Sequence, residues 1–164
     1  MQNRRQAYRI SAVGGNLTGF LVARKVEFEF LEKKVTHHVG EASAASGIGL
    51  SELVKTIVFL DQNSKPLIAV VLGDQTVSRH KLQECSKSKE VRIAPDNIAE
   101  AMTGYPTGGI PPVGHRRRIP VFVDNAVASR DYVWAGGGSR IKLVKLKPVD
   151  IIRLSNATVC DIVI

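Results

Sequence analysis

Hydrophobic residues fall into short runs separated by polar turns along most of the chain, and the clearest runs lie in the middle of the sequence. Residues 55–60 and 66–72 are mostly apolar, and the polar segment 61–65 (DQNSK) lies between them. Turn-forming residues between two such runs predict a β-hairpin. The second run is continuously apolar, which is typical of the more buried strand of a pair.

The same pattern predicts further strands and several short helices. Strands are expected at residues 26–30, 90–93, 119–123, 132–135, 141–147 and 159–164. Helices are expected from a Thr36 cap to near Gly47 or Gly49, from a Ser78 cap to residue 86, from 95 to 103 before Gly104, and from Pro148 to 153. Because strands outnumber helices, the pattern indicates an α+β domain with a mixed sheet or a partial barrel and helices packed around it.

The N-terminal part of the chain carries the weakest pattern. Glycines at positions 14 and 15 interrupt any long helix, so residues 1–24 are expected to form a helical or partly ordered extension and residues 25–164 the domain. A chain of 164 residues can bury a core without a metal or a disulfide. No apolar run reaches the ~18 residues that cross a bilayer, and no secretory signal follows the basic N-terminus. We therefore expect a cytoplasmic protein that does not bind a membrane.

Few residues are candidates for redox or metal chemistry. Cys85 and Cys160 are 75 positions apart, which fits neither zinc ligation nor a disulfide framework, so two free thiols are expected. The neighbouring side chains of His37 and His38 diverge, and no carboxylate or cysteine stands at ligand spacing. The sequence therefore predicts no metal site and no cofactor.

Positive charge is concentrated in the C-terminal half. The formal net charge is +8 and the isoelectric point is near 9.8. Residues 115–153 carry nine basic and three acidic side chains, which gives this segment a net charge of +6. A localised basic region attracts phosphates by steering and counterion release, so a polyanion partner is favoured over a merely solvated basic face.

Two glycine clusters and one lysine are candidates for a site. Residues 104–114 (GYPTGGIPPVG) and 135–139 (AGGGS) match neither a P-loop nor a dinucleotide fingerprint. Their backbone could approach a ligand closely, or they could be structural turns. Lys55 lies in an otherwise apolar run, so it either extends to water or serves a site. The basic run 115–118 (HRRR) follows the first cluster directly and could hold phosphates.

Taken in order, several motifs resemble the YbaK/prolyl-tRNA synthetase-associated editing domains. They are VKTIVF at 54–59, GD at 73–74, TGY at 103–105, GGIPPVG at 108–114 and AGGG at 135–138, and the resemblance runs from about residue 36 to residue 164. It implies a mixed, mainly antiparallel, partly closed, barrel-like β-sheet with flanking short helices. It also implies a trans-acting aminoacyl-tRNA deacylase that hydrolyses the ester of mischarged tRNA, with the tRNA(Pro) class favoured. The implied partners are tRNA and an aminoacyl-tRNA synthetase.

The resemblance also implies roles for individual residues. Lys55 matches the lysine that the family requires for deacylation. The residues that would bind the aminoacyl group are Thr56, Gly108, Gly109, Ile110, Pro111, Pro112, Gly136, Gly137 and Gly138. The basic residues that would hold the acceptor stem are His115, Arg116, Arg117, Arg118, Arg140 and Lys142. Loop N–H groups and a cationic lysine can stabilise the oxyanion of an ester hydrolysis without a Ser-His-Asp triad.

The sequence departs from the family at three positions, which keeps a second hypothesis open. Ala135 and Lys142 stand where free-standing bacterial members have a serine and an aspartate, and a tyrosine is missing near residues 29–30. A tRNA- or synthetase-binding module with the editing fold but without activity is therefore the alternative.

Overall fold

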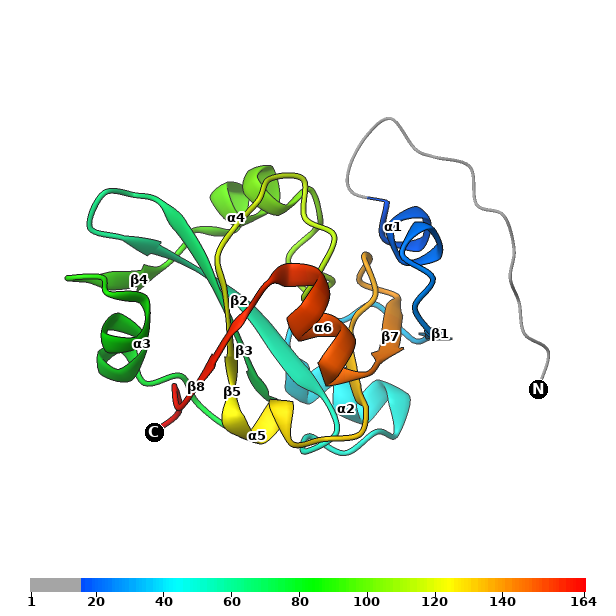
Figure 1. Ribbon diagram of the computed structural model, residues 1–164. Helices are drawn as coiled ribbons and strands as arrows, with labels where there is room; N and C mark the ends of the chain where they lie inside the picture. The colour runs from blue at the N-terminus through cyan, green and yellow to red at the C-terminus, as the bar shows by residue number, and fades with distance from the viewer. Residues whose placement is uncertain (1–15) are drawn as a thin grey trace.

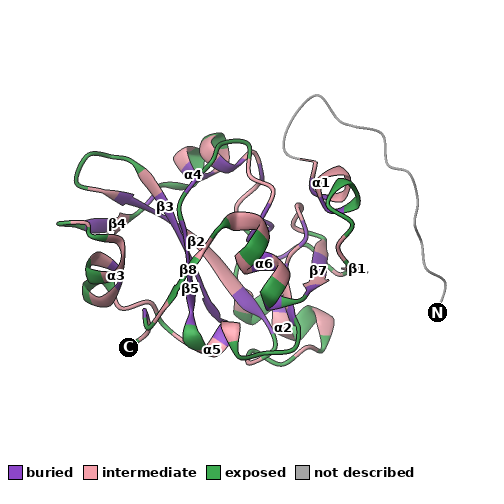
Figure 2. Cartoon of the chain, viewed as in Figure 1, coloured by how far each residue is buried: buried purple, intermediate pink, exposed green. Residues whose placement is uncertain are grey.

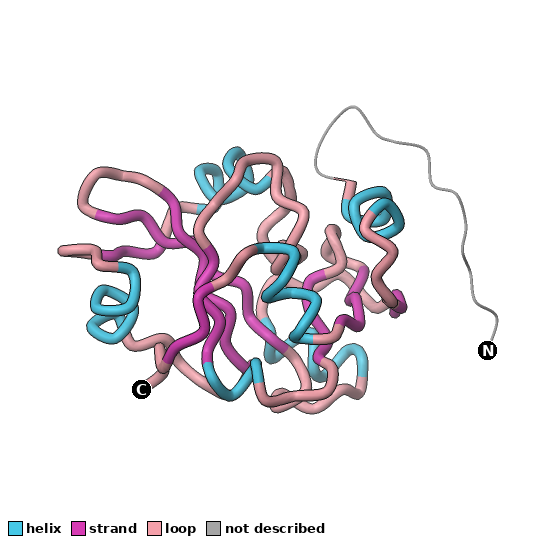
Figure 3. The backbone as a smooth tube through the Cα atoms, viewed as in Figure 1, coloured by secondary structure: helices cyan, strands magenta, loops and turns pink. Residues whose placement is uncertain are grey.

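Two β-sheets form the centre of the computed structural model, which describes residues 16–164 (Figures 1 and 3). The larger sheet has the order β4 (Val91–Ile93), β2 (Val54–Asp61), β3 (Pro66–Leu72), β5 (Val121–Asp124) and β8 (Thr158–Cys160). The smaller sheet has the order β1 (Glu29–Glu32), β7 (Lys142–Leu146) and β6 (Val133–Gly136). The pairs β3–β5 and β5–β8 are parallel and the other four are antiparallel. The predicted α+β class with a mixed, mainly antiparallel sheet is confirmed.

A short bridge joins the two sheets. Leu53, directly before β2, pairs with Trp134 of β6 in parallel, and the Trp134 N–H donates to the Glu52 carbonyl at 2.8 Å. The predicted hairpin is β2–β3, with Val54 opposite Leu72 and Leu60 opposite Pro66. On its other edge β2 pairs with β4 only from Phe59 onward. The edge at residues 54–57 is therefore free of strand pairing, and this edge faces the site described below.

Six short helices surround the sheets in the described part of the chain. They are α1 (Leu17–Ala23), α2 (Val39–Ser46), α3 (Arg79–Ser86), α4 (Asp96–Thr103), α5 (Asn125–Ala128) and α6 (Pro148–Ser155). Ser78 caps α3 as predicted, because its hydroxyl accepts from the Lys81 N–H. Helix α4 ends at Thr103 and is capped by Gly104, whose φ of +83° suits glycine. No helix within residues 16–164 is long and apolar enough to cross a bilayer.

The hydrophobic core lies on both faces of the larger sheet, and Figure 2 shows its central strands as buried. Val58, Ile68 and Val70 pack on one face together with residues of the smaller sheet. Leu17 and Leu21 of α1 are buried in this same cluster, so α1 packs against the rest of the fold. The first 15 residues of the predicted extension lie outside the described part of the chain.

Several local predictions were wrong. Helix α2 begins at Val39, because Thr36 is buried and its hydroxyl accepts from the Lys33 ammonium instead of capping a helix. The strand expected at 26–30 lies at Glu29–Glu32, and the last strand ends at Cys160 instead of residue 164. Helix α5 was not expected, since four residues show no helical periodicity.

The expectation of two free thiols was also wrong. Cys85 of α3 and Cys160 of β8 form a disulfide, with their Cα atoms 6.7 Å apart. Helix α3 covers the second face of the larger sheet, where Leu82 is fully buried. This packing places Cys85 beside the last strand, a proximity that linear spacing does not reveal.

Candidate active site

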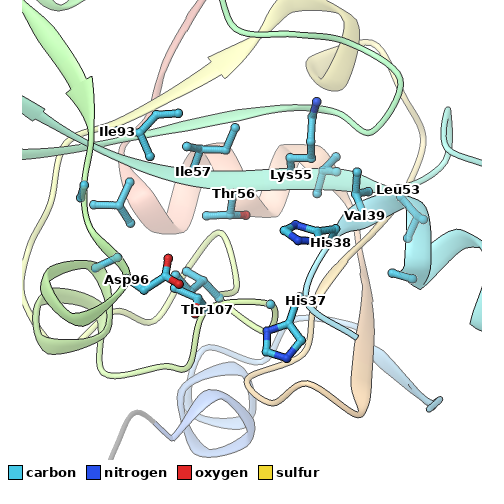
Figure 4. Close-up of a pocket in the computed structure, with 18 of the residues that line it drawn as sticks. His37, His38, Val39, Leu53, Lys55, Thr56, Ile57, Ile93, Asp96 and Thr107 are labelled. Carbon is cyan, nitrogen blue, oxygen red and sulfur yellow. The ribbon is translucent and has the colours of Figure 1, made fainter. Parts of the chain in front are cut away.

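A cavity of about 520 Å³ lies beside the free edge of β2. Its walls come from the start of α2, the edge of β2, the segment before α4, and both glycine clusters (Figure 4). The predicted site residues that line it are Lys55, Thr56, Gly108, Ile110 and Gly136. Most of the remaining wall is apolar, including Val54, Val58, Ala99 and Leu143. Segments far apart in the sequence thus meet around one hollow of a size that suits a small ligand.

The two glycine clusters contact each other directly. The Gly138 N–H donates to the Gly109 carbonyl at 2.8 Å. A Cβ atom at position 109 would lie 2.5 Å from the Ser139 carbonyl carbon, and one at position 136 would lie 2.4 Å from the Ile110 carbonyl oxygen. These glycines therefore permit close packing of two backbones. Gly109, Pro111, Pro112, Gly137 and Gly138 do not line the cavity.

Two backbone N–H groups of the first glycine cluster remain available to donate hydrogen bonds to a ligand. Gly108 and Ile110 both line the cavity, and their N–H groups donate to no group of residues 16–164. Gly108 has φ of +86° and lies against the Thr36 carbonyl, which a Cβ would approach to 2.7 Å. A backbone N–H held by a packed loop is the kind of donor that stabilises an oxyanion without reorganising.

Lys55 borders the cavity, but its ammonium group points to the other face of β2. In Figure 4 the Lys55 side chain extends away from Thr56, Asp96 and Thr107. Its Nζ donates to the carbonyl oxygen of Gln75, in the loop between β3 and α3. Burial lowers the pKa of the Lys55 ammonium below its usual value, and the carboxylate of Asp74 partly opposes this effect.

Thr56 lies on the cavity side of β2, opposite to Lys55. Its hydroxyl oxygen is sealed from solvent and has no hydrogen-bond partner among the described residues. An unpaired buried hydroxyl costs stability. Local alternation along the strand explains why these adjacent residues face opposite ways.

The loop at 104–114 is braced from within. Tyr105 is buried, and its hydroxyl donates to the Gly114 carbonyl at 2.9 Å. Burial raises the pKa of Tyr105 to about 12. His115 Nε2 lies 2.7 Å from the Pro111 carbonyl oxygen, and burial lowers the pKa of this imidazole. His115 is therefore hydrogen-bonded to the end of this loop, whereas the sequence predicted that it would bind a phosphate of tRNA.

The other predicted tRNA-binding residues lie outside the cavity. Arg140 donates to the Thr107 carbonyl at 2.8 Å and lies 3.6 Å from the Glu100 carboxylate, so it ties the second glycine cluster to α4. Lys142 lies 5.5 Å from the centre of the Phe30 ring. Arg116, Arg117 and Arg118 are exposed. Their roles in binding tRNA stay predictions.

Four polar residues of the cavity were missed as site residues. His37, His38, Asp96 and Thr107 line it, and the first two were interpreted only as a helix start or a surface pair. Figure 4 shows His38 beside the β2 edge and Asp96 across the hollow from it. No sequence pattern links these positions, because they come from different elements. The described residues contain no group of three His, Cys, Asp or Glu that could hold a metal ion.

A family model described as the aminoacyl-tRNA editing domain matches residues 33–154. The chain belongs to this family. The matched range contains every residue that lines the cavity, from His37 to Leu143. The predicted family resemblance is therefore confirmed, and the cavity is the candidate site of an editing domain.

Individual relatives agree with the family assignment. A protein of Enterococcus faecalis, provisionally named Cys-tRNA(Pro)/Cys-tRNA(Cys) deacylase EbsC, is 28% identical to this chain over 138 residues, which are 83% of each of the two chains. The proline–tRNA ligase of Desulfovibrio desulfuricans is 33% identical over 118 residues, which are 71% of this chain and 20% of the ligase. The ligase is thus similar to the editing domain over only a fifth of its length.

Solved structures share the fold over nearly the whole chain. The hypothetical protein APE2540 has a TM-score of 0.81 at 32% identity, with 89% of this chain and 97% of that one covered. A protein provisionally described as a trans-editing enzyme for prolyl-tRNA synthetase has a TM-score of 0.78 at 26% identity, with 90% and 94% covered. In both comparisons about nine tenths of each chain is covered, so the shared fold extends over most of this chain.

Proposed function

We propose that this protein is a trans-acting aminoacyl-tRNA deacylase that hydrolyses the ester of mischarged tRNA, with tRNA(Pro) as the favoured class. The observation that carries the proposal is the cavity beside β2, where the β2 edge meets the available N–H groups of Gly108 and Ile110. Membership of the editing family and the names of the two free-standing relatives support the same reaction.

The cavity provides what an ester hydrolysis needs. A water molecule adds to the carbonyl carbon of the aminoacyl ester, and the negative charge that develops on the carbonyl oxygen requires preorganised donors. The N–H groups of Gly108 and Ile110 are the candidates for this role. Collapse of the intermediate breaks the bond to the terminal ribose oxygen, which takes up a proton. The products are the free amino acid and uncharged tRNA.

Lys55 is the proposed catalytic cation, and its ammonium group has to move to the cavity before it can act on the ester. Its ammonium group donates to Gln75 on the far face of β2 in the free protein. The β2 edge at residues 54–57 is not covered by another strand, so a rotation of the flexible side chain around this edge brings the charge to the cavity.

A panel of mischarged tRNAs tests the proposal. The wild-type chain should release the amino acid from at least one aminoacyl-tRNA(Pro), and Lys55→Met should lower kcat by about 10²–10³ without unfolding the protein. Lys147→Met is the control, because the Lys147 ammonium lies outside both the cavity and the C-terminal segment and pairs with the Glu27 carboxylate at 2.9 Å. The control should keep full activity.

The second candidate function is a tRNA- or synthetase-binding module without activity. The observation that favours it is the Lys55–Gln75 hydrogen bond, which turns the only proposed catalytic cation away from the cavity. Absence of turnover on every tRNA of the panel, together with retained tRNA binding, would establish this module and refute the deacylase.

A further inference from the structure

A second cavity, of about 340 Å³, lies at the turn of the β2–β3 hairpin. Lys65 and Asp61 line it from the hairpin, and Ser86 and Ser88 line it from the end of α3. Arg117 and Arg118, in the segment before β5, complete it. None of these residues lines the first cavity. The hollow is therefore a separate feature of the surface.

The charges around this hairpin cavity favour an anion. The side chains of Lys65, Arg117 and Arg118 are exposed and form no ion pair with any of residues 16–164. The single carboxylate in the wall, Asp61, accepts the N–H groups of Asn63 and Lys65 at 2.8 and 2.9 Å, so it is engaged in its own turn. Three unpaired cations face one paired carboxylate.

The surrounding residues hold this cavity in shape and add to its charge. Arg92 of β4 donates to the Asp61 carbonyl at 3.0 Å and to the Ser64 hydroxyl at 2.9 Å, which fixes the hairpin turn. The hydroxyls of Ser86 and Ser88 are hydrogen-bonded to each other at 2.8 Å. Arginine offers planar, paired donors that match the oxygens of a phosphate.

The distance between the two cavities restricts what the second one can bind. Along β2, Val58 of the first cavity and Asp61 of the second are three positions apart, and Lys55 and Asp61 are six, which corresponds to about 10 and 20 Å at ~3.3 Å per residue. Along one strand of a duplex these distances are on the order of three to six phosphates. A phosphate at the hairpin cavity is therefore several nucleotides away from an ester at the first cavity.

We infer that the hairpin cavity, formed by Lys65, Arg117 and Arg118 beside Ser86 and Ser88, binds backbone phosphates of the tRNA acceptor stem. This inference rests on the proposed function, because it takes the ester to lie at the first cavity. The contact would hold the stem while the charged end enters beside β2, and it would not depend on the base sequence.

The test compares a whole substrate with a truncated one. The variant Arg117→Ala/Arg118→Ala is measured on aminoacyl-tRNA and on 3′-aminoacyl-adenosine, which has no stem. The matched control is Arg79→Ala/Arg130→Ala, which removes the same charge from two other exposed positions. The Arg117→Ala/Arg118→Ala variant, here called the pocket variant, should lose about tenfold or more in kcat/KM on aminoacyl-tRNA at 0.15 M salt. Its kcat/KM on the adenosine ester should be unchanged. The control should lose less than twofold on both.

Direct binding of an uncharged tRNA(Pro) transcript separates this inference from the proposed function. The log–log salt dependence of its affinity should become shallower by about 1–2 in slope for the pocket variant. This readout holds even if the wild-type chain hydrolyses no ester. An unchanged salt slope, or an equal loss on the tRNA and adenosine substrates, would overturn the inference.

Discussion

The contact between the two glycine clusters can be tested by a single methyl group. In Gly136→Ala the new Cβ would lie 2.4 Å from the Ile110 carbonyl oxygen, 2.8 Å from the Ile110 carbonyl carbon and 2.9 Å from the Gly109 carbonyl carbon. All three atoms belong to the backbone, so no side chain can rotate to make room. The two segments must separate, and the N–H donors of the first cluster must move with them.

The size of the effect follows from overpacking. Forcing a methyl group into a closely packed region costs about 1–3 kcal/mol. For a chain of 164 residues each kcal/mol lowers Tm by about 2–4 °C, so the expected decrease is about 2–12 °C. The control is Gly40→Ala in α2, where a Cβ has nothing within 4 Å. Alanine should stabilise this helix by about 0.5–1 kcal/mol.

Urea unfolding followed by fluorescence measures both variants with one probe. Trp134 is the single tryptophan of the chain, and it lies in β6 two residues from Gly136. The midpoint should fall for Gly136→Ala and rise for Gly40→Ala at an unchanged slope. A Gly136→Ala midpoint equal to or above that of the wild type would refute the idea that these glycines serve backbone packing.

Three further predictions concern stability. Because burial lowers the pKa of His115 below its usual 6.5, the unfolded chain binds this proton more readily, so the free energy of unfolding should decrease as pH falls below about 6.5. Urea midpoints at pH 7.5 and 5.5 measure this decrease, and the difference between the two midpoints should be smaller in His115→Gln than in the wild type. The variant Cys85→Ser/Cys160→Ser should lose about 2–4 kcal/mol, which chemical denaturation checks, and a reductant should lower the wild type to the same value. Thr56→Val removes an unpaired buried hydroxyl, so thermal unfolding should show a gain of about 1 kcal/mol.

Each of these has a result that would contradict it. Equal midpoint changes with pH in the wild type and in His115→Gln would remove the imidazole as the cause. Insensitivity of the wild-type midpoint to reductant would contradict a stabilising disulfide. A lower Tm for Thr56→Val would indicate that the hydroxyl has a partner in solution.

The elements predicted well are those that local chemistry specifies. The β2–β3 hairpin follows from two apolar runs around a polar turn, and α3 follows from the Ser78 cap. The predictions that failed depend on distant residues. Thr36 has the chemistry of a cap, but its N–H donates to the distant Arg140 carbonyl at 3.2 Å, and its hydroxyl accepts from Lys33, which also donates to that carbonyl. The disulfide depends on how α3 lies against β8.

For the site, the sequence predicted which segments contribute residues, but not which of their residues line the cavity. The glycine-rich clusters indicated that the backbone closely approaches another group. In the structure this group is the backbone of the other glycine cluster. The Gly138 N–H donates to Gly109, and a Cβ at position 109 or 136 would meet the opposite backbone. Composition alone cannot distinguish a backbone that accommodates a ligand from one that accommodates another backbone, because glycine serves both equally.

The orientation of the Lys55 side chain also depends on residues that are distant in the sequence. The Gln75 carbonyl that accepts its ammonium lies in a segment held by the C-terminal residues of the chain. The Ile164 N–H donates to Thr76 at 3.0 Å, and Val77 forms a bridge with Val163. The last residues of the chain thus fix the acceptor that competes with the cavity for the lysine. Any change that loosens the C-terminal segment should weaken this hydrogen bond and increase the time that the ammonium group spends at the edge of β2.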